Sequence, residues 1–447
     1  MGKFAKRLQK KMWSIHNWVG LYAGVVIAIL SITGVVALFK TEIDEFVNSD
    51  YYDVPSDVRG ERIEIAAVVD SVRQVYGDKS VGYIGVPRSP DKNWIVTAVE
   101  QNSSLDIKAW EIFVDPYTGK VVGQRDSFRS IGYFIRNIHV RLYEGLFGRY
   151  FVGIAGIALL ISTLTGFWIY GNFMKKQLFA TIRRKNLRIT MADYHKLIGV
   201  TTLVFNLVIA ITGAWLGLQG LLQRPIVGDR PGVYQPPEEK KFSKEEDAAF
   251  SVNYLEVYEA SRKLFPELEP TSFAPSTNGN GVVTVRGIVP RTAFERSHFQ
   301  LTLDKETLQE VHRLDIRKMG LGAKLFYIQE SMHFGDWGGW MLKIVYAFFG
   351  ITSGFLALTG FVVYLKRTEK KRLEKPKFVE LKPLLLRWTY GILAGILVLM
   401  ILSLSFGVIV PSLLVIIGVY GTLIFLLIRV LVLFLKRKVK SVRLKTS

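Results

Sequence analysis

Four histidines occupy repeated positions at the ends of long apolar segments. His16 begins the pattern H-N-W-V-G…I-T-G and His195 begins H-K-L-I-G…I-T-G, with glycines four and eighteen residues later in both patterns. His139 and His333 each stand 27 residues before the glycine of an L-T-G-F motif. Ionisable side chains at membrane depth are costly, and neutral imidazole is a common metal ligand, so these four residues are candidate ligands.

The grouping of the histidines indicates what they could hold. Two imidazoles from facing helices at one depth can bind the iron of a planar haem from both sides, within an apolar shell that tunes its potential. A zinc or copper site would need three or four converging ligands, whereas these histidines separate into two pairs. We therefore expect His16 with His195, and His139 with His333, to be axial haem ligands. The alternative is that each histidine is a structural polar residue at a helix end.

Glycines near the histidines have two interpretations. Because they lack a Cβ, they would let a flat ring approach the helix backbone closely. They would equally suit close helix–helix packing, which is common in membranes. The residues concerned are Gly20, Gly24, Gly34, Gly199 and Gly213.

Other side chains near these positions are less informative. Met332, next to His333, is either an alternative axial ligand or a packing residue. Trp337 and Trp340 suit an interfacial aromatic belt, or else line an outer pocket for a substrate or a haem edge. His298 and His312 have no counterpart in the first half, and we expect them to be solvated surface residues.

Apolar segments that cross a bilayer must position the histidines. A bilayer core of about 30 Å needs about 20 apolar residues in a helix. The first segment is too long for a signal-peptide core and is not followed by a small-residue cleavage site, so we expect it to remain as an anchor. Six segments predict six transmembrane helices, at 19–39, 150–171, 197–218, 341–365, 388–409 and 412–435.

The net charge of +20 collects on alternate connections between these helices. The basic connections contain 26 Lys and Arg but four acidic residues, and they lie at 1–15, 171–194, 366–387 and 436–447. Lys and Arg gather on the cytoplasmic side of membrane proteins. Both termini are therefore expected inside, and residues 40–149 and 219–340 outside. The charge indicates membrane orientation and argues against nucleic acid as a partner.

The two halves form a parallel repeat. The offset between them is 179 residues for His16 and His195 and 194 residues for His139 and His333, so the second outside segment is 15 residues longer. Each half starts and ends inside, and such repeats are related by an axis along the membrane normal. Equivalent residues then lie at equal depth. This places the first pair near the cytoplasmic side and the second pair near the outer surface.

The first outside segment is expected to be a small α+β domain. Residues 63–76 have helical periodicity, and strand-like runs follow at 81–86, 94–100 and 110–114. The sequence Asp115-Pro116-Tyr117-Thr118-Gly119-Lys120 then predicts a hairpin turn into another strand, because it combines a turn proline with a glycine suited to positive φ.

The second outside segment repeats this plan. A helix is expected at 251–264, strands near 281–287 and 297–303, and a return strand after Asp304-Lys305-Glu306-Thr307. Residues 224–248 are rich in proline and charge and predict an extended linker.

Several chemistries are excluded by composition. The chain has no cysteine, which excludes thiolate iron–sulfur clusters, covalent c-type haem, a catalytic cysteine and disulfides. The sequence contains no dinucleotide fingerprint, P-loop or flavin motif.

Three patterns together resemble the PepSY-associated transmembrane family over about residues 10–366. They are the helix start H-N-W-V-G-L-Y…T-G, the second-helix motif L-T-G-F and the hairpin V-D-P-Y-T-G-K-V-V. That family includes inner-membrane ferric-siderophore reductases and related iron-regulated proteins of Gram-negative bacteria. The second outside segment departs from the pattern, because Leu303-Asp304-Lys305-Glu306-Thr307-Leu308 lacks the proline and the glycine.

The resemblance implies two haem b groups held by His16, His139, His195 and His333. It also implies that electrons pass from a cytoplasmic or quinol donor to a ferric siderophore in the periplasm. Reduction would release the iron, because hard oxygen ligands hold Fe(II) less well than Fe(III). Two other functions stay open: a haem-free accessory or sensor protein whose outer domains bind a partner, and a quinol-linked cytochrome b with another periplasmic acceptor.

The expected fold is a mainly α protein of the bacterial inner membrane. Its six transmembrane helices form two parallel two-helix repeats and a C-terminal hairpin, and two small α+β, PepSY-like domains lie in the periplasm. Helices are expected within 1–40, 136–172, 195–219, 331–366 and, as a pair, 387–436. The periplasmic domains span 41–135 and 220–330, the cytoplasmic loops 173–194 and 367–386, and the cytoplasmic tail 437–447.

Overall fold

The structure is a computed structural model, and it forms two compact units that are described separately. Of the described residues, one unit contains those within 3–30, 140–203 and 352–374, and the other contains those within 31–139 and 204–351. The predicted helices within 387–436 and the tail at 437–447 lie outside the described residues. The described residues are 3–55, 60–76, 80–87, 89–101, 107–174, 181–236, 252–276, 279–294, 296 and 298–374.

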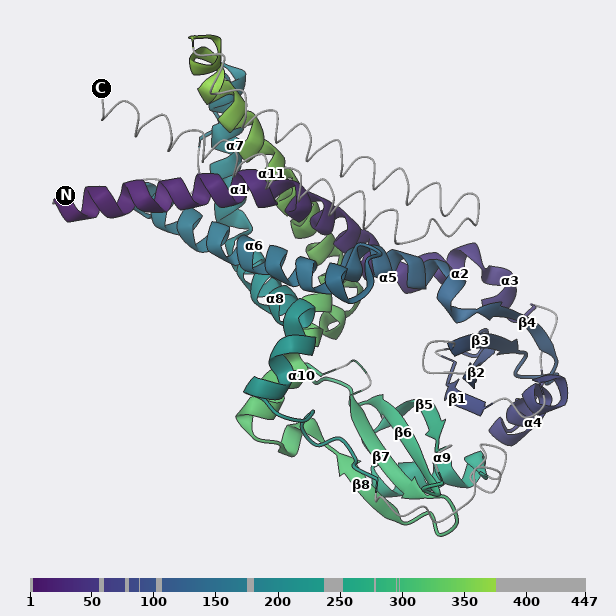
Figure 1. Cartoon of the computed structure of the whole chain (residues 1–447). Coiled ribbons are helices and arrows are strands. Elements are labelled where there is room, and N and C mark those ends of the chain that lie inside the picture. The colour runs from purple at the N-terminus through teal and green to yellow at the C-terminus, as the bar shows by residue number, and fades with distance from the viewer. Residues whose placement is uncertain are drawn as a thin grey trace, which may run out of the picture. The chain divides into compact units, whose positions relative to one another are not determined.

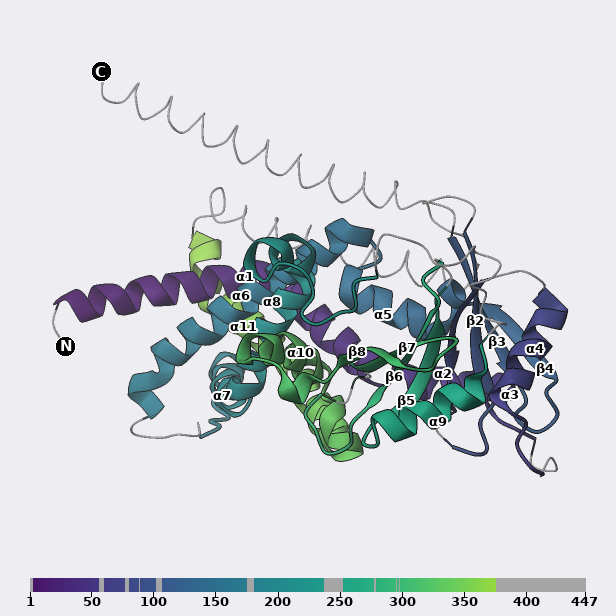
Figure 2. The same cartoon turned by 90° about the horizontal axis from the view of Figure 1, so that it is seen from below.

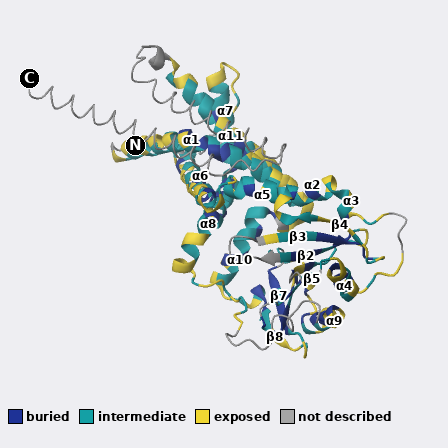
Figure 3. Ribbon diagram, turned by 45° about the vertical axis from the view of Figure 1, so that its right-hand side comes forward, coloured by how far each residue is buried: buried dark blue, intermediate teal, exposed yellow. Residues whose placement is uncertain are grey.

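Four of the described helices are long and apolar enough to cross a membrane (Figure 1). They correspond to the first four predicted spans, and the chain is a membrane protein. Large apolar side chains such as Leu164, Ile344 and Phe348 are exposed on them, whereas fully buried side chains such as Val96, Phe113 and Leu303 lie on the strands (Figure 3). The four helices are α1 (Lys3–Leu38), α6 (Gly145–Met174), α8 (Leu203–Ile226) and α11 (Gly339–Glu374).

The second helix of each half is interrupted, where the sequence predicted one continuous helix over 136–172 and over 331–366. In the first half, α5 (Ile131–Arg141) is followed by Leu142 and Tyr143, both with positive φ. In the second half, α10 (Leu321–Phe334) ends at Gly335, which has φ +65 and precedes α11. A left-handed residue ends an α-helix. His139 and His333 therefore lie near the C-terminal ends of short helices that precede the spans.

The predicted helix over 195–219 is also two helices. α7 (Leu187–Thr201) begins earlier than expected, because the Asn186 side chain accepts a hydrogen bond from the Ile189 N–H at 3.0 Å. It ends at Thr202, whose hydroxyl donates to Ile198 O at 2.7 Å, and α8 follows. Threonine bonding to the preceding turn bends helices. His195 therefore lies within α7, near its middle.

One antiparallel sheet joins the two outside segments, which the sequence predicted as two domains (Figures 1 and 2). The strand order is β4-β3-β2-β1-β5-β6-β7-β8, so each segment supplies four neighbouring strands. The segments meet where Ile84 of β1 pairs with Phe273 of β5, and both side chains are fully buried. The strands are β1 (Ser80–Gly85), β2 (Trp94–Gln101), β3 (Ile107–Val114), β4 (Val121–Asp126), β5 (Glu269–Pro275), β6 (Val282–Ile288), β7 (Phe299–Asp304) and β8 (Glu310–Leu314).

Two amphipathic helices cover the sheet, as the periodicity of 63–76 and 251–264 predicted. α4 (Ile65–Tyr76) packs on β2 and β3, α9 (Tyr254–Leu264) packs on β6, and the two helices contact each other. Val68 and Val257 are fully buried in the shared core. The structure adds one strand that the sequence does not predict: β5 begins and ends beside Pro270 and Pro275, which normally argue against a strand.

The two hairpins have the same turn, although only the first contains glycine. The Asp115 carboxylate accepts from the N–H groups of Tyr117 and Thr118 at 2.7 and 3.1 Å. Asp304 does the same for the residues two and three positions after it, at 3.1 and 3.0 Å. Gly119 has φ +70, and Leu308 takes its place with φ +55. Leu308 also packs, partly buried, against the sheet core, although its backbone adopts a conformation that is rare for leucine.

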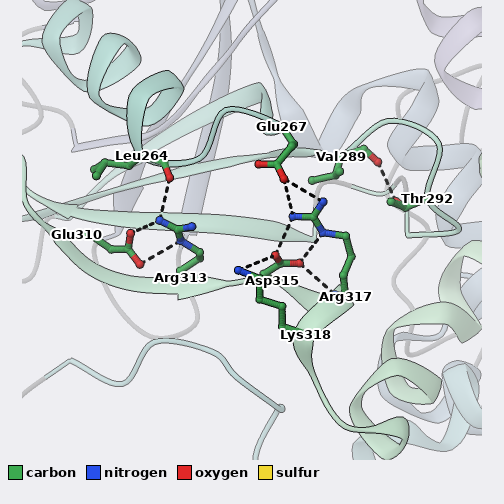
Figure 4. A network of polar contacts seen from close by, with 9 residues as sticks. All are labelled: Leu264, Glu267, Val289, Thr292, Glu310, Arg313, Asp315, Arg317 and Lys318. Carbon is green, nitrogen blue, oxygen red and sulfur yellow. Dashed lines mark hydrogen bonds and ion pairs between the residues drawn. The ribbon is translucent and has the colours of Figure 1, made fainter.

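Ion pairs fix the helices that lead into and out of the sheet. Arg125 of β4 binds both carboxylate oxygens of Asp44 at 2.9 and 2.6 Å, which attaches α2 (Lys40–Val47) to the sheet. In the second segment, Arg313 donates to Leu264 O at 2.9 Å, and Arg317 binds Asp315 at 2.8 Å (Figure 4). The first contact connects the end of α9 with β8, and the second lies within the turn between β8 and α10.

Candidate functional site

The two first-helix histidines lie next to each other. His16 comes from α1 and His195 from α7, and their ring centroids are 6.0 Å apart with the rings inclined by 76°. Both side chains are partly buried among apolar helices. The structure therefore brings together the two residues that the depth argument paired.

The two second-helix histidines form a similar pair in the other unit. His139 lies on α5 and His333 on α10, and their ring centroids are 6.3 Å apart with an interplanar angle of 34°. Each pair takes one histidine from each half of the repeat. The four predicted residues are thus divided into two pairs, one in each compact unit.

A threonine and a main-chain carbonyl hold each imidazole of the first pair. His16 Nδ1 is 3.0 Å from Ser162 O and 3.2 Å from Thr165 Oγ1. His195 Nδ1 is 3.0 Å from Leu356 O and 3.1 Å from Thr359 Oγ1. The histidine on the first helix of each half is therefore oriented by the second helix of the same half.

In the second pair, the first helix of each half supplies the threonine and the later helix supplies the histidine. His139 Nδ1 is 3.2 Å from Thr33 Oγ1 of α1, and His333 Nδ1 is 2.9 Å from Thr212 Oγ1 of α8. Here the histidine after the outside segment is oriented by the helix before it. All four threonines directly precede a glycine in the sequence.

These contacts fix which ring nitrogen carries the proton. The Thr165 hydroxyl donates to Ile161 O at 2.6 Å and the Thr212 hydroxyl donates to Val208 O at 2.6 Å. Since each hydroxyl has one proton, its oxygen can only accept from the imidazole. In His16 and His333, Nδ1 is therefore the N–H donor and Nε2 keeps its lone pair, and the Leu356 carbonyl assigns the same tautomer to His195. A hydrogen bond from one imidazole nitrogen to a neighbouring acceptor is how proteins orient metal-binding histidines.

The separation of the rings fits one metal ion held by each pair. Two imidazoles that bind one ion through Nε2 from opposite sides, with bonds of about 2.0 Å, place their centroids roughly 6.3 Å apart. The observed separations are 6.0 and 6.3 Å. Within the described residues, His, Cys, Asp and Glu form no group of three or more that could hold a metal. The donor set is therefore two imidazoles, which suits an ion whose other ligands come from a macrocycle.

Comparison with known proteins gives the family of this chain. A sequence profile of the PepSY-associated TM region matches residues 13–367, which include all four histidines. The chain belongs to this family. It is also 26% identical over 250 residues to an uncharacterized protein of Pseudomonas aeruginosa, an alignment that covers 52% of this chain and 62% of the relative. The match therefore spans less than two thirds of the relative's length.

In this member of the PepSY-associated family, four glycines lie directly against the histidine rings. A Cβ on Gly34 would lie 2.9 Å from His139 Cε1, and one on Gly213 would lie 3.2 Å from His333 Cε1. Gly166 and Gly360 have the same relation to the other two histidines, at 3.1 and 3.0 Å. The flat ring that approaches these glycines is the imidazole itself.

The other three glycines named from the sequence do not lie against an imidazole. A Cβ on Gly20 would meet no atom within 4 Å, and those on Gly24 and Gly199 would make ordinary contacts at 3.8 and 3.9 Å with Ala357 and Leu356. The contacts of Gly24 and Gly199 are with residues of α11, so these two glycines suit the helix-packing interpretation.

Sequence reasoning missed the four threonines. The signal was present, because a T-G dipeptide occurs at Thr33, Thr165, Thr212 and Thr359. Only the glycine of each dipeptide was interpreted. A threonine in an apolar helix usually bonds its own preceding turn, so its hydroxyl alone does not indicate a contact with another helix.

The expectation that His298 is a solvated surface residue was wrong. Its side chain is buried, with a residue exposure of 7%, and its ring centroid lies 5.3 Å from that of Tyr327. His298 Nε2 is 3.4 Å from Glu330 Oε2, and this contact holds the pKa of the Glu330 carboxyl below its ordinary value. His312 is partly buried, and its Nε2 lies 2.7 Å from Gly232 O.

The aromatic residues after His333 are partly exposed, as an interfacial position requires. Trp340 is 60% exposed, and its ring stacks on Phe39 at 5.9 Å. Trp337 is 37% exposed. The carbonyl of Met332 accepts a hydrogen bond from the Tyr346 hydroxyl at 2.7 Å, which fixes the end of α10 beside α11.

An ion pair anchors the helix that carries His195. The Asp193 carboxylate accepts from the Arg183 guanidinium at 2.9 and 2.8 Å and from the Arg183 main-chain N–H at 3.1 Å. The hydrogen bond from Arg183 lowers the pKa of the Asp193 carboxyl to about 2. Lys196 adds a contact at 3.4 Å. The basic segment before α7 is thereby attached to α7 at Asp193, which lies two residues before His195.

Proposed function

We propose that the chain is a haem-dependent oxidoreductase of the bacterial inner membrane. It would pass electrons from a donor on the cytoplasmic side to Fe(III) held by a siderophore in the periplasm. The observation that carries the proposal is the pair of bis-imidazole arrangements, each with Nδ1 hydrogen-bonded and Nε2 left with a lone pair. That arrangement suits axial ligation of haem iron.

The chain's own residues would bind and orient the group. His16 and His195 would hold one haem b, and His139 and His333 the second. The threonine hydroxyls would keep the proton on Nδ1 and so leave the Nε2 lone pair to bind the iron. Bound haem would supply a one-electron carrier within the apolar bundle.

The direction of transfer and the substrate rest on the sequence. The basic connections support cytoplasmic termini, and the parallel repeat supports one histidine pair near each membrane surface. Membership of the PepSY-associated family supports iron as the cargo, because the resemblance includes ferric-siderophore reductases. Hard oxygen ligands hold Fe(II) less well than Fe(III), so reduction at the outer side would release the iron.

An absorption spectrum of the purified chain tests the cofactor. We expect a Soret band and about two b-type haems per chain. His312→Ala provides a control, because this histidine lies in the sheet domain outside both pairs and its loss should leave the spectrum unchanged. A preparation without a Soret band, even after haem supplementation, would exclude the proposal and favour the haem-free accessory protein.

Anaerobic iron transfer tests the substrate. The dithionite-reduced chain, freed of excess reductant, is mixed with a ferric siderophore and a ferrous chelator. The chain's haem should oxidise as the ferrous chelate forms. Haem that stays reduced in the presence of the ferric siderophore would instead favour a cytochrome b with a different periplasmic acceptor.

A further inference from the structure

The hydrogen bonds at Nδ1 differ between His195 and His333, the two paired histidines of the second half. His195 Nδ1 has two acceptors, Leu356 O at 3.0 Å and Thr359 Oγ1 at 3.1 Å. His333 Nδ1 has Thr212 Oγ1 at 2.9 Å as its one acceptor among the residues that the structure describes. The carbonyl equivalent to Leu356 O would be that of Ile209, three residues before Thr212. Ile209 O lies 3.4 Å from the Thr212 hydroxyl.

Thr212 is well placed to act as an acceptor. It is buried, with an exposure of 7%, and its hydroxyl proton is directed at Val208 O at 2.6 Å. The remaining lone pairs face an apolar interior, where a hydrogen bond is stronger than in water. The following residue, Gly213, lacks the side chain that would keep the imidazole away.

An acceptor at Nδ1 changes the ligand strength of Nε2. Drawing the Nδ1 proton toward an oxygen raises the basicity of the imidazole, and a more basic axial ligand favours Fe(III) over Fe(II). Hydrogen bonding around the iron ligands is one of the means by which proteins set reduction potentials. We therefore expect the number of acceptors at Nδ1 to change the midpoint potential of the bound iron.

We propose that Thr212 is a positioning residue that lowers the midpoint potential of the iron bound at His333. Thr359 is the corresponding acceptor at His195, where the Leu356 carbonyl is a second acceptor. The inference rests on the proposed function, because it requires haem at the His139–His333 pair. It adds a specific role for a residue that acts through the imidazole of His333.

Thr212→Val removes the acceptor while keeping the shape of the side chain. We expect the outer haem of this variant to titrate at a higher potential, by on the order of a tenfold change in its redox equilibrium, which is 59 mV for one electron. Thr212→Ser keeps a hydroxyl and should restore the original potential. Thr359→Val is the matched control, because Leu356 O stays in place, and should shift the inner haem less.

Thr201→Val controls for the loss of a helical hydroxyl, since Thr201 bonds Leu197 O and Ile198 O within its own helix. Potentials are measured by optical redox titration, and haem content is measured on the same samples. Two haems with unchanged potentials in Thr212→Val would overturn this inference and leave the proposed function standing. A wild-type chain without haem would overturn both. Should Thr212→Val fail to fold, Thr212→Ala against Thr212→Ser makes the same comparison.

Discussion

At the scale of single residues, the T-G dipeptide is the repeated unit of the histidine sites. The threonine hydroxyl gives its proton to the preceding turn and accepts from the imidazole. The glycine beside it removes the Cβ that would push the ring away. Both residues are required at consecutive positions, because one supplies the acceptor and the other supplies the space. This explains why I-T-G and L-T-G occur at matched offsets in both halves.

Replacing one of these glycines should displace its histidine. In Gly166→Ala the new Cβ would lie 3.1 Å from His16 Cε1 and 3.5 Å from Nδ1, so the ring or the helix must shift. Overpacking of this kind costs about 1–3 kcal/mol. We expect haem to be lost from the His16–His195 pair and kept at the His139–His333 pair. The haem-to-protein ratio should then fall from about two toward one.

Gly171→Ala is the control for this prediction. Gly171 lies on the same helix, and its Cβ would meet no atom within 4 Å. The variant should keep both haems. Equal haem content in the Gly166 and Gly171 variants would contradict the role given to Gly166.

How far the site could be predicted depends on the type of residue. His16, His139, His195 and His333 could be found, because an ionisable residue beside an apolar span is rare and the repeat marks equivalent positions. Their pairing followed from the orientation of the repeat. The threonines could not be assigned, because a hydroxyl that bonds its own helix has the same sequence pattern as one that also faces an imidazole.

At the scale of elements, the lengths of the apolar segments predicted four of the described helices, but the breaks beside them were missed. Leu142 and Tyr143 adopt positive φ although neither is a glycine. No local sequence preference indicates such a conformation, which tertiary contacts must stabilise. The joining of the two sheet halves was missed for a related reason: alternation predicts a strand and its buried face, and it does not specify the neighbour of an edge strand.

The loop contact at Asp193 gives a pH-dependent prediction. Asp193→Asn should lower the free energy of unfolding at pH 7, because the charge-assisted contact between the buried Asp193 carboxylate and the half-exposed Arg183 guanidinium is lost. The pKa of the Asp193 carboxyl is lowered to about 2 from an ordinary value near 4. The wild-type advantage is therefore present above about pH 4 and is lost as the pH falls toward 2.

Thermal unfolding of both proteins at pH 7, 5 and 3 measures this effect. Asp70→Asn, which changes an exposed carboxylate on α4, is the control and should be nearly neutral. A difference between wild type and Asp193→Asn that grows as the pH falls would contradict the assignment.

The first hairpin gives a prediction for the sheet domain. Gly119 has φ +70, and a Cβ there would lie 3.2 Å from Ile63 Cδ1 and 3.3 Å from Ser71 Oγ. Gly119→Ala should therefore cost about 1–2 kcal/mol. Hydrogen exchange should rise in the peptides that cover β3 and β4. Gly60→Ala, which meets no neighbouring atom, is the control, and equal exchange in both variants would exclude strain at the turn.

At the scale of the whole molecule, the chain is a duplicated unit whose halves complete each other twice. The histidine pairs take one imidazole from each half, and the sheet takes four strands from each half. Neither half alone contains a complete pair or the complete sheet. The duplication therefore doubles the number of sites and makes each site depend on both halves.

This organisation predicts that the two sites can be lost separately, whereas the proposed electron transfer needs both. His139→Ala should remove one spectroscopic haem population and leave that of His16 and His195, because the two pairs belong to different compact units. His16→Ala should have the reverse effect. In proteoliposomes with reductant inside and a ferric siderophore with a ferrous chelator outside, both variants should lose most of the iron transfer, since each interrupts the proposed relay at one membrane surface. Loss of both haems from one substitution would argue against the pairing, and full iron transfer with one haem would argue against a relay.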